Sequence, residues 1–181
     1  LLAVRTNADH RAAQAAHGIG NIDLLVVNLY PFEETVAKGA TAAEVIENID
    51  VGGPAMIRAA AKNHDSVTVI VDPADYATVL QDIESTGGTT QGTRQHLAAK
   101  AFARTATYDA AIASWFSETL ATPTPPYFAI GGKRAQSLRY GENPHQTAAA
   151  YRTGVNEPGV LAAKQMQGKE LSYNNINDAD A

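Results

Sequence analysis

The stretch "GGPAMIRAAAKNHDSVTVIVD", residues 52–72, carries a helix signal and a strand signal in direct succession. Pro54 and the alanine-rich segment behind it predict a helix over 52–63, because proline fits the first helical turn and alanine favours the helical interior. The β-branched run "SVTVIVD" (66–72) predicts a buried strand. A helix followed at once by a buried strand indicates an α/β fold.

The segments on either side continue this alternation. "IDLLVVNLY" (22–30) is a mostly apolar run of strand length, which predicts a strand covered on both faces and ended by Pro31. Residues that cap or end helices predict further helices over 7–18, 41–49, 72–85 and 93–120. Strands that alternate with helices favour a parallel sheet in an α/β layer fold.

The longest helical pattern, 93–120, presents a broad apolar face. We expect this face to consist of Leu97, Phe102, Ala103, Ala106, Ala110, Ile112, Ala113 and Phe116. "ATPTPP" (121–126) then interrupts regular structure, because its three prolines favour an extended connector. We therefore place a first domain at 1–121, a proline-rich linker at 122–126 and the start of a second domain at 127–181. The last of these is too short to bury a good core alone.

Composition limits the class of function. The net charge is −5 and the basic residues do not cluster, which argues against a nucleic-acid groove or an anionic membrane surface as partner. The longest aliphatic run, "LLVV" (24–27), is far shorter than a membrane span. The chain has no cysteine, which excludes thiolate metal sites and fits a cytoplasmic location. No histidine and acidic residue have metal-ligand spacing, so we expect no metal site.

"NLYPF" (28–32) is a first candidate site, at the carboxyl end of the predicted strand. Open α/β sheets bind ligands at this edge, and the two-residue period places Asn28 and Tyr30 on one face. The alternative is structural, with Tyr30 covering the edge of the core and Asn28 bonding a loop.

"IDVGGPAMIRAAAKNH" (49–64) is a second candidate. Gly52 and Gly53 allow a ligand close to the backbone, and the free N–H groups of a helix start favour an anion. A carboxylate at Asp50 and an ammonium at Lys62 in one pocket would shift each other's pKa and hold or move a proton. The alternative is a capped turn with a surface lysine.

"LRYGENPHQT" (138–147) gathers five kinds of hydrogen-bonding side chain in ten residues. The Arg139 guanidinium fits a phosphate or a carboxylate, and Tyr140 can stack or donate. His145, placed by Pro144, can pass protons at neutral pH. The stretch is therefore a third candidate site.

Four motifs, "NLYPF", "IDVGGPAMIRAAAKNH", "LRYGENPHQ" and "LSYNNINDADA", together resemble one family: the bifunctional enzymes of late purine synthesis. These join an IMP cyclohydrolase domain to an AICAR transformylase domain. The resemblance implies that 1–121 is the later part of a methylglyoxal-synthase-like α/β domain. It also implies that 127–181 opens a transformylase domain similar to cytidine deaminase, in a homodimeric cytoplasmic protein.

The resemblance implies a role for each candidate residue in the ring-closing reaction, which converts formyl-AICAR to IMP with loss of water. Tyr30 would donate to the formyl oxygen, as in an oxyanion site. Asp50 would accept the carboxamide proton while Lys62 holds the other side of that group. Asn28 and the backbone of Gly52 and Gly53 would position the substrate.

The transformylase transfers a formyl group from its co-substrate 10-formyltetrahydrofolate to the weakly nucleophilic amine of AICAR. By resemblance, Arg139 and Tyr140 contact the nucleotide and His145 lies beside the reacting centre. Asn175, in "LSYNN", matches a further substrate contact.

An alternative function is a regulatory ligand-binding module, since methylglyoxal-synthase-like domains also serve as sensors. A sensor needs an anion site but not Tyr30, Asp50 and Lys62 together, which favours the enzyme. The chain ends where Asn177 and Asp178 are expected to cap a helix, which indicates a fragment. The family's phosphate loop and "KTLHP" segment would precede it and its Lys-His pair and folate pocket would follow, so we expect the 181 residues alone to be inactive.

Overall fold

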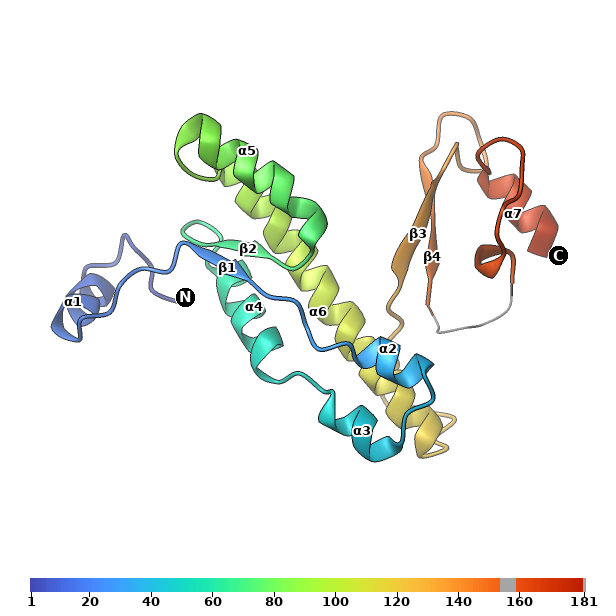
Figure 1. The fold of residues 1–181 in the computed structure, drawn as a ribbon, viewed down its shortest axis with the longest axis horizontal. Coiled ribbons are helices and arrows are strands. Elements are labelled where there is room, and N and C mark those ends of the chain that lie inside the picture. The colour runs from blue at the N-terminus through green and yellow to red at the C-terminus, as the bar shows by residue number, and fades with distance from the viewer. Residues whose placement is uncertain (154–158, 181) are drawn as a thin grey trace.

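The computed structural model describes residues 1–153 and 159–180. The molecule is elongated, with a helix-rich α/β part at one end and a β-hairpin with a short helix at the other (Figure 1). The N-terminus lies inside the helix-rich part, and the C-terminus lies at the other end of the long axis. Within the described ranges, no helix is both long and apolar enough to cross a membrane.

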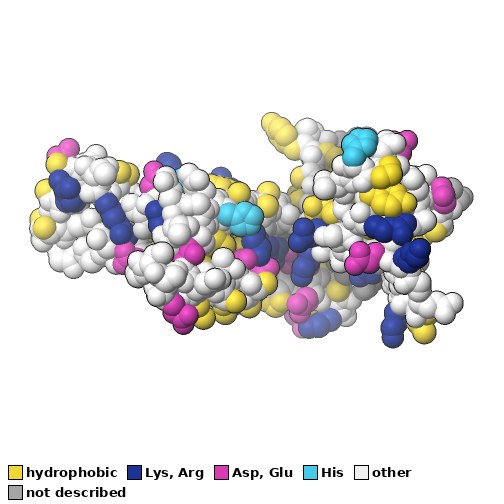
Figure 2. Space-filling view, turned by 90° about the horizontal axis from the view of Figure 1, so that it is seen from above, with side chains coloured by type: hydrophobic (Ala, Val, Ile, Leu, Met, Phe, Trp, Pro, Cys, Tyr) yellow, Lys and Arg dark blue, Asp and Glu magenta, His cyan; other side chains and the backbone are white. Residues whose placement is uncertain are grey.

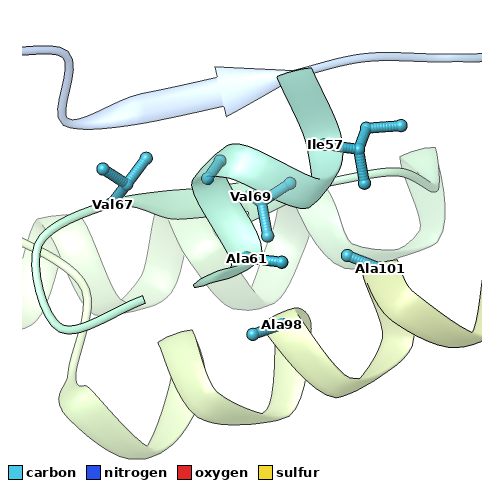
Figure 3. Packing of buried hydrophobic residues seen from close by; sticks show 7 residues of the cluster. Ile57, Ala61, Val67, Val69, Ala98 and Ala101 are labelled. Carbon is cyan, nitrogen blue, oxygen red and sulfur yellow. The ribbon is translucent and has the colours of Figure 1, made fainter. Parts of the chain in front are cut away.

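The α/β part is built on two parallel strands, β1 (Leu24–Val26) and β2 (Thr68–Ile70). Helices α4 (Gly52–Lys62) and α6 (Gln91–Thr119) pack against each other and against β2. Their shared core contains Ile57, Ala60, Ala61, Val67, Val69, Ala98 and Ala101 (Figure 3). The alanines allow the two helix backbones to approach closely. The expected parallel α/β arrangement is therefore confirmed, as is the buried strand within 66–72.

The expectation that the strand within 22–30 is covered on both faces is wrong. Its odd-numbered residues Leu25, Val27 and Leu29 pack against the core, whereas Leu24 and Val26 are 42% and 46% exposed. Helix α5 (Tyr76–Thr86) reaches the opposite face of β2, where Ile70, Val79 and Leu97 form a second cluster. Among the described elements none extends that layer over β1, so one face of β1 remains open.

The smaller helices begin where the capping residues predict. Asn7 caps α1 (Ala8–Ala16), a Thr41–Glu44 capping box opens α3 (Ala42–Glu47), and Asp72 caps the 3₁₀ turn η1 (Pro73–Asp75) that leads into α5. Gly87 ends α5 with φ at 77°, a left-handed conformation that glycine adopts without strain. Helix α2 (Phe32–Ala37) was not expected and starts directly after Pro31.

The buried face of α6 differs from the expected one. Its buried residues are Leu97, Ala98, Ala101, Thr105, Tyr108 and Ala110, while Phe102 and Phe116 are exposed, as are Ala103, Ala106 and Ala113. The buried face tolerates two hydroxyl groups because each has a hydrogen-bond partner. The Thr105 hydroxyl donates to the Phe102 carbonyl, and the Tyr108 hydroxyl accepts the N–H of the distant Asp50. Of the expected face, Leu97 and Ala110 are buried and Ile112 packs against the core, whereas the other five residues are exposed. Apolar periodicity alone therefore predicted the buried face only in part.

Beyond α6, residues 121–132 contain neither helix nor strand. Strands β3 (Lys133–Leu138) and β4 (Ala148–Arg152) then pair antiparallel, followed by the 3₁₀ turn η2 (Val160–Ala162) and helix α7 (Tyr173–Asp180). Only Gly141, Ala150 and Ser172 are buried among the described residues of this part, as its short length predicts.

Asn177 and Asp178 do not cap a helix, because both lie inside α7. The capping residue is Ser172, whose carbonyl accepts from Ile176 N–H and whose hydroxyl accepts from Asn175 N–H at 3.4 Å. The Asn175 side-chain oxygen in turn accepts the Ser172 N–H at 3.1 Å. This reciprocal pair starts the helix one turn earlier than the sequence indicated.

Candidate functional site

The first candidate site joins the end of β1 to the start of α4 through Asp50. One carboxylate oxygen of Asp50 accepts the backbone N–H of Gly53 at 2.7 Å, and the other accepts that of Tyr30 at 3.2 Å. Gly53 is required here, since a Cβ at this position would lie 2.6 Å from the Asp50 carboxylate. The structure therefore brings Tyr30, Asp50 and Gly53 together.

The side chains around Asp50 leave room for a ligand. The Tyr30 side chain is 56% exposed, and two neighbours are exposed as well: Asn28, in the chain after β1, and Gly52, the first residue of α4. A carboxylate can accept about four hydrogen bonds, of which the backbone uses two at Asp50. The half-buried carboxylate thus serves as a cap for α4 and keeps acceptor capacity for a substrate.

Lys62 is not part of this group. It is the last residue of the uninterrupted helix α4, whose first residue is Gly52. At 1.5 Å per residue, the backbones of these two residues lie roughly 15 Å apart along the helix axis. The Lys62 side chain is exposed, and its charge is favourable at a helix carboxyl end. The structure therefore does not bring the Lys62 ammonium to the Asp50 carboxylate.

Tyr108 of α6 packs beneath the surface of the first site and contacts its backbone. The sequence analysis did not identify it as a site residue. Its hydroxyl accepts the Asp50 N–H at 2.8 Å and donates to the Asn48 carbonyl at 3.2 Å. The side chain is fully buried, and this burial raises the pKa of the Tyr108 phenol, which keeps the hydroxyl protonated. The helical spacing places Tyr108 on the same buried face of α6 as Leu97 and Ala101. Because a buried phenol requires a hydrogen-bond partner, this spacing could have indicated a contact with a distant segment.

The second candidate site is the loop between β3 and β4. The Arg139 guanidinium lies 4.9 Å from the centre of the Tyr140 ring and donates to its hydroxyl at 3.2 Å. This hydrogen bond and the positive charge of Arg139 lower the pKa of the Tyr140 phenol. The exposed guanidinium and the polarised phenol together suit an anionic ligand.

The segment "LSYNN" (171–175) lies directly against this loop. Arg139 N–H donates to the Leu171 carbonyl at 2.8 Å, and Tyr173 N–H donates to the Tyr140 carbonyl at 3.1 Å. The Asn174 amide donates to the Glu142 carbonyl at 3.1 Å. Two predicted motifs, separated by some thirty residues, thus form one surface that includes Asn175.

His145 occupies the tip of a tight turn and is exposed. The turn is held by its neighbours: the Gln146 side chain accepts the Asn143 N–H at 2.7 Å, and the Gln146 N–H donates to the Asn143 carbonyl at 3.0 Å. A hollow of about 280 Å³ beside the turn is lined by Gly141, Glu142, Gln146, Thr147 and Tyr173. His145 therefore lies at the edge of this surface, where a ligand can reach it. No side chain in the described part of the chain forms a hydrogen bond that orients its imidazole.

Basic and acidic side chains are interspersed along the face shown in Figure 2. Within 1–153 and 159–180, no group of three His, Asp or Glu side chains could hold a metal ion.

Comparison with known proteins places both candidate sites in a family context. A family model for the AICARFT/IMPCHase bienzyme matches residues 60–181, and one for the MGS-like domain matches residues 7–55. The bifunctional purine biosynthesis protein PurH of Parvibaculum lavamentivorans is 64% identical over 181 residues, which is all of this chain and 34% of that protein. The PurH of Bradyrhizobium diazoefficiens is also 64% identical, over 182 residues and with the same coverage.

A solved structure is also similar. The crystal structure of ForH matches with a TM-score of 0.50 and 35% identity, over 64% of this chain and 60% of that one. The chain spans about a third of the length of the curated relatives it matches.

Proposed function

The chain belongs to the AICARFT/IMPCHase bienzyme family, and we propose that the full-length protein formylates AICAR and closes formyl-AICAR to IMP. The observation that carries this proposal is the 64% identity to PurH proteins over the whole length of this chain. The alternative, a regulatory ligand-binding module over 1–121, is not favoured, because the bifunctional relatives match the chain from end to end.

In the ring-closing reaction the carboxamide nitrogen of formyl-AICAR attacks the formyl carbon, and water leaves. An amide nitrogen is a poor nucleophile, so the catalyst has to remove a proton and stabilise negative charge on the formyl oxygen. We assign the first task to the Asp50 carboxylate and the second to the Tyr30 hydroxyl. Asn28 and the backbone of Gly52 and Gly53 position the substrate.

The geometry around Asp50 supports this assignment. Backbone N–H groups hold the two carboxylate oxygens from opposite segments of the chain, so the group is oriented before a substrate arrives. Lys62 lies at the far end of α4, and we therefore assign the proton transfer without it.

For formyl transfer, we assign binding of the AICAR nucleotide to Arg139 and Tyr140, with Asn175 as a further contact. The formyl donor is 10-formyltetrahydrofolate. The exposed His145 imidazole would accept the proton that the AICAR amine loses. The close packing of 171–175 on the loop supports a single nucleotide surface.

The domain division belongs to the same proposal. Residues 1–121 form part of the ring-closing domain, 122–126 the linker, and 127–181 the start of a transformylase domain with a cytidine-deaminase-like fold. The full-length protein would be a cytoplasmic homodimer.

The test is a pair of assays on the full-length protein. AICAR with 10-formyltetrahydrofolate should yield IMP, and formyl-AICAR alone should yield IMP without folate. Absence of turnover in both assays, from a protein that unfolds cooperatively, would refute the proposal.

A further inference from the structure

Helix α6 supports the first candidate site from a distant part of the sequence. Tyr108 is 58 residues from Asp50, yet its hydroxyl accepts the Asp50 N–H at 2.8 Å. The same hydroxyl donates to the Asn48 carbonyl at 3.2 Å, so one buried group fixes both sides of the peptide segment that leads into Asp50.

The ring of Tyr108 supports the other half of the site. It meets the Phe32 ring edge to face, with 6.0 Å between ring centres, and Phe32 lies two residues after Tyr30. One helical turn earlier, the Arg104 guanidinium stacks on the Tyr108 ring and bonds the Glu33 carboxylate at 2.7 Å. Tyr108 therefore contacts both segments that carry the proposed reacting groups: its hydroxyl bonds the 48–50 segment, and its ring packs on Phe32, close to Tyr30 in sequence.

We propose that Tyr108 is a positioning residue for ring closure: its hydroxyl sets the backbone of Asp50, and the Asp50 carboxylate in turn holds Tyr30. This proposal rests on the proposed cyclohydrolase function. Tyr108 is fully buried and does not touch the substrate, so it acts only through Asp50 and Phe32.

The hydroxyl can be separated from the ring by one substitution. Tyr108→Phe keeps the contacts with Phe32 and Arg104 but removes the acceptor of the Asp50 N–H and the donor to the Asn48 carbonyl. The 48–50 segment is then free to shift, and a misplacement of about 1 Å at a reacting group can cost on the order of a hundredfold in rate.

The experiment measures ring closure of formyl-AICAR by the full-length protein. We expect Tyr108→Phe to lower kcat roughly tenfold to a hundredfold and to change KM by less than about threefold, because orientation rather than binding is lost. Transformylase turnover in the same protein should stay unchanged, and a cooperative urea unfolding transition of the ring-closing domain shows that the variant is folded. Thr105→Val, which removes another buried hydroxyl from the same face of α6, is the matched control and should keep kcat.

A double-mutant cycle separates positioning from general destabilisation. In the Asp50→Asn background, Tyr108→Phe should lower the residual kcat by less than about twofold, since both changes disable the same group. Losses that multiply would overturn the proposal. If Tyr108→Phe does not fold, Phe32→Leu tests the other support, the ring contact through which Tyr108 holds the segment after Tyr30. We expect kcat to fall there, and an unchanged kcat would overturn the positioning role of the Tyr108 ring.

The outcomes distinguish this inference from the function on which it rests. A normal kcat in Tyr108→Phe together with an impaired Asp50→Asn would reject the positioning role and leave the cyclohydrolase assignment intact. A normal kcat in Asp50→Asn as well would reject the site assignment itself.

Discussion

The Asp50 carboxylate accepts the backbone N–H of Tyr30 at 3.2 Å, across twenty residues of sequence. This contact joins the carboxyl end of β1 to the turn that starts α4, so the two proposed reacting groups are fixed relative to each other by the main chain. A ligand at this edge of the sheet would meet a carboxylate already held from two sides.

Gly53→Ala should destabilise the fold, because its Cβ would lie 2.6 Å from the Asp50 carboxylate and would force that group to move. Overpacking of this kind costs about 1–3 kcal/mol in the free energy of unfolding, which urea denaturation measures. Gly52→Ala is the matched control for stability, since no atom lies within 4 Å of its added Cβ. Equal stabilities of the two variants would contradict the described turn.

Thr41→Ala should remove the capping box of α3, in which the Thr41 hydroxyl accepts the Glu44 N–H and the Glu44 carboxylate accepts the Thr41 N–H. The loss is expected to be about 0.5–2 kcal/mol in the free energy of unfolding. Thr41→Ser keeps both bonds and should retain most of the stability. A Thr41→Ser protein as unstable as Thr41→Ala would argue against the cap.

Stability should fall in acid partly through Asp72. The Ala74 N–H and then Lys100 lower the pKa of this carboxyl in the folded protein. A group whose folded pKa lies below its unfolded value, about 3.9 for aspartate, stabilises the fold above that value and loses the effect as pH falls through the folded pKa. Asp72→Asn should therefore flatten the decline in stability below about pH 4. The exposed Asp109→Asn is the charge-matched control, and identical acid profiles for the two variants would count against this origin.

The ionisation of Tyr140 reports on the second site. The hydrogen bond from Arg139 favours the phenolate, so the pKa of Tyr140 is lowered. Arg139→Gln should raise it, which ultraviolet titration of phenolate absorbance can follow when compared with Tyr140→Phe. A titration curve that is the same with and without Arg139 would show that the two side chains do not interact in solution.

Local sequence signals predicted much of the fold. The caps at Asn7, Thr41 and Asp72 and the stop at Gly87 each depend on hydrogen bonds or backbone angles within a few residues, so their residue types suffice. The open face of β1 could not be predicted in this way. An apolar run predicts a strand that is buried on both faces. Which faces of β1 are covered depends instead on where helices such as α5 pack, and α5 packs beside β2.

The candidate sites show the same limit. Arg139, Tyr140 and "LSYNN" were recognised from their motifs, and the structure brings them together. Tyr108 was missed because its partner Asp50 is distant in sequence. The expected approach of Lys62 to Asp50 did not account for the length of the helix between them.

The most direct test of the account is ring closure by Tyr30→Phe in the full-length protein. Loss of one oxyanion donor costs about 100- to 1000-fold in kcat, and we expect a loss of that size for formyl-AICAR. Transformylase turnover should be unchanged, and Tyr76→Phe on α5 serves as the tyrosine control. An unaltered rate of IMP formation from formyl-AICAR by Tyr30→Phe would contradict the assignment of the catalytic site to the end of β1.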